Sequence, residues 1–196
     1  MPRKPSHTRE GLIEDAMHHF WRYGYAGSSM DDLVRSTGVA RHGIYKDVGS
    51  KRDLYLEGFE TYQDTIVTPC FGPVEAPDAG LKQIEAYFHA QISLAEAIGL
   101  PGPGCHMANA MTETAPHDPA VEAQVEAHNA RLQAGFENAV RNSASFLSSG
   151  EVTAMAQFLV ITTQGLWSLS RIVHTTEPMY GHVATLMDLL RARLRR

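Results

Sequence analysis

Apolar residues recur at helical spacing along most of the chain, and this periodicity constrains the fold more than any other feature of the sequence. Between residues 8 and 24, Leu12, Ala16 and Phe20 fall on one side of a helix, and Gly24 stands where that helix would end. Runs that alternate apolar and polar residues are few, and the Asn-Gly and Asp-Gly pairs typical of β-hairpins do not occur. The sequence therefore predicts an all-α protein of about nine helices.

Two of the predicted helices in the first third are unusually short. The first of them has a possible N-cap at Ser28 or Ser29 and ends before Gly38, and the second ends before Gly49. Two helices joined by such a tight turn form a helix-turn-helix, in which the second helix enters the DNA major groove. A corner of this kind also occurs in helical proteins that do not bind DNA, so the pattern alone leaves both interpretations open.

The residue types of the second short helix suit a groove-reading role. Val39, Ile44 and Val48 can dock it, which leaves its other positions for DNA. Arginine can pair with guanine, tyrosine and lysine can reach phosphate oxygens, and a glycine admits close approach of a backbone. The residues expected to contact DNA are Ser28, Ser29, Arg41, His42, Gly43, Tyr45, Lys46 and Lys51.

The charges are segregated along the chain in a way that fits this expectation. Residues 1–52 carry 9 Lys and Arg against 6 Asp and Glu, whereas the remaining residues carry 8 against 16. A basic first quarter on an acidic remainder suggests that one segment meets a polyanion. The signal is modest, because a difference of this size between unequal segments also arises by chance.

The same region resembles the DNA-binding domain of the TetR family of bacterial regulators. The resemblance covers about residues 8–62 and lies in the run SSMDDLVRSTGVARHGIYKDVGSKRDLYLEGFE, preceded by AMHHFWRYGYAG. It implies a repressor that binds a palindromic operator as a homodimer, with the last two helices forming a four-helix bundle with their partners. It also implies that an unidentified small molecule fills a cavity in the C-terminal part and releases the DNA.

The chain departs from the family pattern at three places. Ala40 stands where a Ser or Thr usually caps the recognition helix, which is expected to cost about 1 kcal/mol of local stability. His42 and Gly43 replace a glycine and a small hydroxyl residue, and Asp47-Val48 replaces a polar-aromatic pair. Asp47 is expected either to cap or pair with a neighbouring Lys51 or Arg52, or to reduce non-specific affinity for DNA.

The remaining two thirds is predicted to form longer helices. The Pro- and Gly-rich residues 68–80 are expected to break the preceding helix and to separate a DNA-binding domain, 1–67, from a ligand-binding and dimerisation domain, 68–196. The later helices are predicted over residues 81–97, 105–114, 121–146, 151–174 and 178–193. The apolar stripe of the helix over 81–97 includes a glutamine, Gln91.

The helix over 151–174 is apolar nearly all round, which indicates burial on two sides. One side can face its own subunit and the other a partner, although burial inside one large domain would give the same pattern. The residues predicted to form the dimer interface are Phe158, Thr162, Gly165, Leu169, Val183, Leu186 and Leu190. Those predicted to line a ligand cavity are Phe88, Met107, Met111, Phe136 and Trp167, each of which could equally be a core residue.

Other classes of function find little support in the sequence. There is no Gly-rich phosphate loop, nucleophile elbow or zinc-protease motif, and the ten histidines lack zinc-ligand spacing, so neither an enzyme nor a cofactor or metal site is expected. Cys105 could sense redox change or electrophiles, but a buried structural role is the stronger interpretation.

With two cysteines, no signal-peptide pattern and no apolar run of membrane-spanning length, a soluble cytoplasmic protein is expected. The competing hypothesis is a helical dimer that binds a small molecule or a protein and has lost DNA binding.

Overall fold

The computed structural model describes residues 7–195, and over this range it contains helices and no strand, which confirms the all-α prediction. The chain forms two compact units, one made of the N-terminal residues to Ile66 together with His106–Val125, and the other of Val67–Cys105 together with Glu126–Arg196. No helix in the described range is long and apolar enough to cross a membrane.

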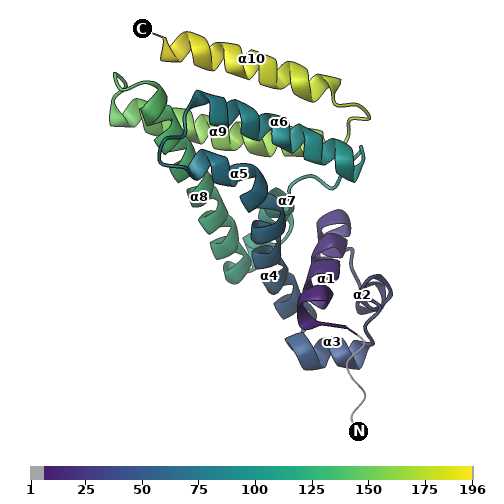
Figure 1. The fold of residues 1–196 in the computed structure, drawn as a ribbon. Helices are drawn as coiled ribbons and strands as arrows, with labels where there is room; N and C mark the ends of the chain where they lie inside the picture. The colour runs from purple at the N-terminus through teal and green to yellow at the C-terminus, as the bar shows by residue number, and fades with distance from the viewer. Residues whose placement is uncertain (1–6, 196) are drawn as a thin grey trace. The chain divides into compact units, whose positions relative to one another are not determined.

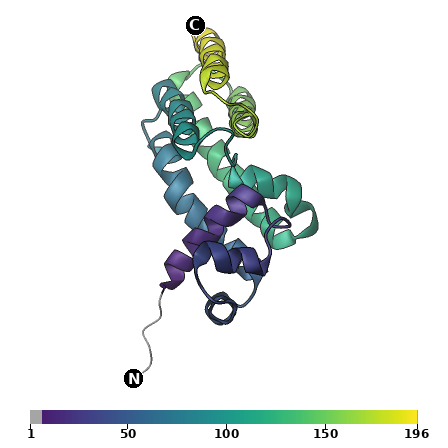
Figure 2. The same cartoon turned by 90° about the vertical axis from the view of Figure 1, so that its right-hand side faces the viewer.

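The first unit holds the predicted helix-turn-helix (Figures 1 and 2). Its elements are α1 (Arg9–Tyr23), α2 (Met30–Thr37), α3 (Arg41–Val48), α4 (Lys51–Tyr62), α7 (His106–Glu113), the short 3-10 turn Ala115–His117 and the beginning of α8 (Pro119–Ser143). Helix α1 packs along α4, and α2 and α3 pack against these two helices. The centre is fully buried and apolar, with Phe20, Leu33, Ile44, Leu54 and Phe59 each at most 1% exposed.

Local capping explains why the helices of this unit begin where they do. The side chain of Thr8 accepts from the Gly11 N–H, and that of Ser50 accepts from the Asp53 N–H, so both act as N-caps. Of the two candidate caps of α2, Ser29 is the one used. It exchanges hydrogen bonds with Asp32 in a capping box.

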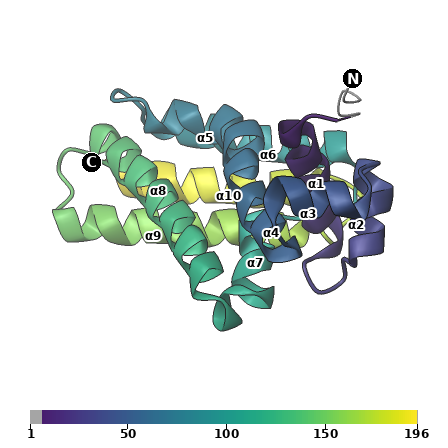
Figure 3. The ribbon, with the colours of Figure 1, turned by 90° about the horizontal axis from the view of Figure 1, so that it is seen from below.

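The second unit consists of longer helices whose apolar stripes face one another. Its elements are α5 (Thr68–Glu75), α6 (Leu81–Ile98), the remainder of α8, α9 (Ser149–Leu169) and α10 (Glu177–Leu194). Helices α6, α9 and α10 run along one another (Figures 1 and 3), and two Arg–Glu ion pairs, Arg191–Glu85 and Arg193–Glu151, join α10 to α6 and to α9. An aromatic core of Phe71, Tyr87, Phe88 and Phe136 joins α5, α6 and α8.

The expected break over residues 68–80 was wrong for its first part. Helix α4 continues through a π-helical turn, Gln63–Val67, into α5, and the chain leaves helical structure only after Glu75. Pro69 lies just after the π-helical turn, where the hydrogen-bond register of the continuous helix changes, so a residue without an N–H is accommodated there. The last apolar helix is also shorter than expected, because α9 ends at Leu169 instead of near residue 174.

Packing divides the chain differently from the predicted domain boundary. Residues 106–125 lie with the first unit, although the sequence placed them in the ligand-binding domain. Helix α7 contacts both α1 and α4, so the DNA-binding candidate includes a segment from the middle of the chain.

Candidate nucleic-acid interface

A tight turn at Gly38 sets the angle between α2 and α3. Gly38 adopts a left-handed conformation, with φ 68° and ψ 6°, and its N–H donates to the Val34 carbonyl. A left-handed residue with this bond is the usual end of a helix, and glycine adopts it without steric cost. The Thr37 hydroxyl then accepts from the Val39 N–H at 3.2 Å, which holds the start of the turn.

Helix α3 is docked by its apolar side and presents its polar side to solvent. Val39, Ile44 and Val48 are at most 7% exposed, as the sequence predicted. The remaining side carries the exposed residues Arg41, His42, Tyr45 and Lys46. An exposed row of this composition on the second helix of a helix-turn-helix can reach both base edges and phosphates.

Arg41 is held by an acidic residue of the preceding helix. Its Nη2 atom lies 2.7 Å from Oδ1 of Asp31, and both side chains are more than half exposed. The pair lies at the surface, so its net contribution to stability is small. Its consequence is geometric, since Asp31 restricts the orientation of the guanidinium at the start of α3.

Asp47 pairs with the N-terminal segment, so the first alternative, pairing with Lys51 or Arg52, was wrong, and the second, a lower non-specific affinity for DNA, stays a prediction. The Asp47 Oδ2 atom lies 2.8 Å from Nε2 of His7, and the Asp47 carbonyl accepts from Nε of Arg9 at 3.1 Å. Arg9 also forms an ion pair with Glu57 on α4. These contacts tie the segment before α1 to the C-terminal end of α3.

The structure places three of the predicted contact residues in internal roles. Ser28 is 1% exposed and its hydroxyl donates to the Gly24 carbonyl, so its side chain is not available to DNA. A Cβ at Gly43 would lie 3.0 Å from the Val39 side chain, so a larger residue there would have to displace a side chain that docks α3. The Lys51 ammonium donates to the Tyr25 carbonyl and lies over the Tyr25 ring, and burial lowers its pKa.

Ala40 leaves the N-terminus of α3 without a side-chain cap. This absence follows directly from the residue type, because alanine has no acceptor for the free N–H groups of the first turn. The first turn of α3 therefore has N–H groups that a side chain does not satisfy, and phosphate oxygens are suitable partners for such groups.

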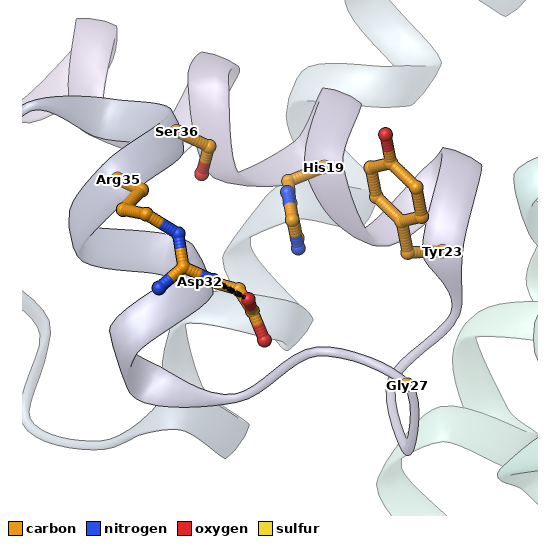
Figure 4. A pocket seen from close by; sticks show the side chains of 6 residues that line it. All are labelled: His19, Tyr23, Gly27, Asp32, Arg35 and Ser36. Atoms are coloured by element: carbon orange, nitrogen blue, oxygen red, sulfur yellow. Dashed lines mark hydrogen bonds and ion pairs between the residues drawn. The ribbon is translucent and has the colours of Figure 1, made fainter.

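A hollow of about 450 Å³ lies between α1 and α2 (Figure 4). It is lined by His19, Tyr23, Gly27, Asp32, Arg35 and Ser36. Asp32 is already shared between the Ser29 cap and an ion pair with Arg35, and the Ser29 hydrogen bonds lower its pKa. The acidic group of the hollow thus serves the α2 N-terminus. Sequence reasoning did not predict this concavity.

Residues 106–125 attach to the helix-turn-helix through charged and polar contacts. The Glu113 carboxylate accepts from the backbone N–H groups of Tyr25 and Ala26 at 3.0 and 2.7 Å. Arg52 donates to both oxygens of Asp118 at 2.6 and 2.8 Å, and this pairing lowers the pKa of Asp118 to about 2. A bidentate Arg–carboxylate pair has a fixed geometry, so α4 and the start of α8 are held in register.

A buried histidine completes this attachment. His106 is 1% exposed, and its ring lies 5.0 to 5.5 Å from the rings of Tyr55, Phe59 and Tyr62, measured between centroids. Burial in this aromatic environment lowers its pKa to about 3, and among the described residues its Nε2 atom has no hydrogen-bond partner. Burial likewise raises the pKa of Tyr55 to about 12.

The predicted dimer residues fall into two groups in the second unit. Phe158 and Gly165 are exposed on α9 and Leu169 is half-buried, as contact with a partner requires. Val183, Leu186 and Leu190 are at most 2% exposed, and Thr162 is also buried, so these four side chains face the interior of their own chain. The α10 stripe was assigned to the wrong surface, because it packs on α6. The apolar side chains exposed on these two helices are Phe158, Ile161, Tyr180 and Leu189.

The predicted ligand-cavity residues are divided between the two units. Phe88, Phe136 and Trp167 lie in the core of the second unit, where the rings of Phe88 and Phe136 stack with centroids 6.3 Å apart. Met107 and Met111 belong to α7 in the first unit. Their role in a ligand site stays a prediction. Within residues 7–195, no cluster of three His, Cys, Asp or Glu side chains is arranged to hold a metal ion.

Residues 12–57 match the family model described as bacterial regulatory proteins, tetR family. The chain is 25% identical over 185 residues to YezE of Bacillus subtilis, an uncharacterized HTH-type transcriptional regulator, covering 91% of this chain and 94% of YezE. It is 22% identical over 184 residues to the HTH-type transcriptional repressor ComR of Escherichia coli, covering 92% and 88% of the two chains.

A solved structure shares the fold over almost the whole chain. It is a cysteine mutant of CifR, a TetR family transcriptional regulator, complexed with double-strand operator DNA. The TM-score is 0.77 at 21% identity, and the match covers 97% of this chain and 99% of the other. The similarity therefore extends beyond the helix-turn-helix to the arrangement of the longer helices.

Proposed function

We propose that this chain, which belongs to the TetR family of bacterial transcriptional regulators, is a repressor that binds a palindromic DNA operator as a homodimer. A small molecule bound in the second unit lowers the affinity for the operator. The protein acts in the cytoplasm, where its operator is found. ComR, a relative over 92% of this chain, is named a transcriptional repressor, and the similar CifR structure holds operator DNA.

The observation that carries this proposal is the surface of α3. Its apolar side is docked by Val39, Ile44 and Val48, and its other side presents Arg41, Tyr45 and further polar residues to solvent. No packing requirement explains this exposed row. The flanking α2 and α4 begin at Ser29 and Ser50, and the N–H groups of their first turns that these caps do not satisfy suit contact with phosphates on either side of the groove.

Dimerisation would use the exposed apolar face of α9 and α10. Phe158, Ile161 and Leu189 are 46%, 67% and 59% exposed, and apolar side chains gathered on two neighbouring helices indicate an interaction surface, whereas singly scattered ones do not. A hollow of about 450 Å³ between the helices is lined by Met155, Phe158 and Leu189 among others. A two-fold arrangement of recognition helices also matches a palindromic operator.

Residues 106–125 offer a route by which ligand binding could reach the DNA. They are fixed to the helix-turn-helix by Glu113 and Asp118, and α8 continues from Pro119 into the second unit without interruption. A ligand that binds more tightly to one conformation of α8 than to another would raise the population of the conformation it prefers. The larger the difference in affinity, the more this shift would change how residues 106–125 hold the helix-turn-helix.

The test is a gel-shift titration with the intergenic DNA next to the protein's own gene, over a range of salt concentrations. The proposal predicts specific retardation of one palindromic segment, with an affinity that falls steeply as salt rises. Lys46→Ala should weaken binding and reduce the salt slope by about 1, as expected for one lost phosphate contact. If no palindromic segment is retarded even at low salt, the proposal is contradicted.

A further inference from the structure

A polar cluster lies inside the apolar core of the second unit. Tyr87 and Gln91 come from α6 and are 4% and 2% exposed, and Thr163 comes from α9 and is 3% exposed. The Gln91 Nε2 atom donates to the Tyr87 hydroxyl at 2.6 Å. The Tyr87 ring is surrounded by other aromatic rings, those of Phe71, Phe88 and Phe136, with centroids 5.0 to 5.7 Å away.

Two atoms of this cluster lack partners. By ordinary hydrogen-bond geometry, neither Oε1 of Gln91 nor Oγ1 of Thr163 has a partner among the described residues, although both atoms are fully buried. The Thr163 hydroxyl nevertheless lies close enough to the Tyr87 hydroxyl to lower the pKa of Tyr87. A buried polar group without a hydrogen-bond partner destabilises the folded state, and two such groups beside one tyrosine are unusual in a protein core. Rotating the Gln91 amide by 180°, so that its oxygen and nitrogen change places, still leaves one buried atom without a partner. The oxygen would then accept from Tyr87, and the amide nitrogen would be left without an acceptor.

The groups around the cluster are uncharged at neutral pH. Burial raises the pKa of Tyr87, against the lowering effect of the nearby Thr163 and Gln91 side chains. Burial also raises the pKa of Cys70, whose thiol is close enough to Tyr87 to influence its titration. A ligand carrying a net charge would therefore find no counter-charge in this cluster and would lose its hydration.

We propose that Tyr87, Gln91 and Thr163 form the polar end of the effector site, and that its ligand is a small, uncharged aromatic molecule bearing a hydroxyl, carbonyl or amide group. The inference rests on the proposed function, because it specifies the ligand of the second unit. The aromatic rings around Tyr87 would contact the apolar body of the ligand, and the unpartnered atoms would bond its polar group. A site that leaves buried polar groups unpaired rejects analogues lacking the matching group.

The test uses three probes of similar size, phenol, toluene and benzoate, titrated into the full-length protein without DNA and followed by calorimetry. The expected result is that phenol binds at least about tenfold more tightly than toluene or benzoate, which corresponds to about one buried hydrogen bond. Equal binding of phenol and toluene, or no binding of any probe, would overturn the proposal. Equal binding is the result expected if ordered water already satisfies the two atoms.

Two apolar variants separate recognition from folding. Both Thr163→Val and Gln91→Leu should lose the preference for phenol. Thr163→Val removes only an unpartnered atom, so it should unfold at the same or a higher temperature than the wild type, whereas Gln91→Leu also removes the donor to the Tyr87 hydroxyl and should unfold at a lower temperature. Thr162→Val is the matched control, because the Thr162 hydroxyl already donates to the Phe158 carbonyl at 2.8 Å. This control should keep the preference. A preference for phenol that survives in both Thr163→Val and Gln91→Leu would also overturn the proposal.

The two proposals fail in distinguishable ways. If the protein binds its operator but shows no phenol preference, the ligand assignment is wrong and the repressor proposal stands. If phenol binds as expected and no operator is found, the site is real and the DNA-binding role is wrong.

Discussion

Replacing His106 by phenylalanine should remove a large part of the acid sensitivity of the fold. His106 has an ordinary pKa of 6.5, which burial lowers to about 3 in the folded protein. The unfolded chain therefore takes up a proton first as the pH falls. As far as His106 contributes, the free energy of unfolding is highest above about pH 6.5, and it falls progressively as the pH falls toward 3.

The expected magnitude follows from these two values. Between pH 7 and pH 5, protonation of His106 in the unfolded chain lowers the free energy of unfolding by about 2 kcal/mol. His128, also buried, has its pKa lowered to about 4 and contributes a further loss of about 2 kcal/mol with the same sign. Paired carboxylates such as Asp118, with a pKa of about 2, lose their contribution only at lower pH.

The assay is urea unfolding at pH 7, 6 and 5, at one fixed protein concentration because assembly affects apparent stability. The wild type should lose about 4 kcal/mol over this range and His106→Phe about 2 kcal/mol. Phenylalanine suits the site because Tyr55, Phe59 and Tyr62 already surround the ring. The matched control is His174→Phe, whose native ring is exposed, and it should follow the wild type.

Two results would refute the reasoning. One is a wild type that is equally stable at pH 7 and pH 5. The other is an identical pH dependence for the wild type and His106→Phe, which would mean that the protonation of His106 is not coupled to folding.

Three further predictions concern the two surfaces of the protein. Arg41→Ala should weaken operator binding by about 1–3 kcal/mol and relax discrimination at one base pair, with helix content and assembly unchanged. Competition gel shifts with operator variants measure this, and an unaltered affinity would contradict the prediction. Ala40→Ser should raise the free energy of unfolding by about 1 kcal/mol by supplying the missing cap of α3, and unchanged stability in urea titrations would show that the cap is not limiting. Leu189→Glu should convert dimers to monomers in sedimentation while keeping the helical circular dichroism signal. Leu190→Glu is the control and should lose that signal, because Leu190 is buried. If Leu189→Glu remains dimeric, the interface lies elsewhere.

Local sequence signals predicted most of the fold. The ends of α1, α2 and α3 follow from Gly24, Gly38 and Gly49, each of which has a positive φ, and the starts of α2 and α4 follow from capping serines. These signals act over a few residues, so they can be identified without knowing the tertiary structure. The same locality explains the error at residues 68–80, where the prolines and glycines predict a break although the helix continues through Pro69 and Pro73 to Glu75.

The partners of the site residues could not be predicted, because they come from distant parts of the chain. Asp47 pairs with His7, 40 residues away, and Arg52 pairs with Asp118, 66 residues away. Periodicity identified the apolar stripe of α10 but not which helix it faces, so Leu186 was assigned to a partner subunit when it packs on its own chain. One signal for the polar cluster of the second unit was present in the sequence. Gln91 interrupts an otherwise apolar stripe, and a buried polar residue is more informative than its apolar neighbours.

Methylation interference tests the central claim that α3 reads base edges in the major groove. Operator DNA methylated at guanine N7, a major-groove atom, would be sorted by gel shift into bound and free fractions for the wild type and for Arg41→Ala. The account predicts that methylation of one guanine in each half-site excludes DNA from the wild-type complex and has no effect on binding by Arg41→Ala. No interference at any guanine, or the same interference pattern with both proteins, would contradict it.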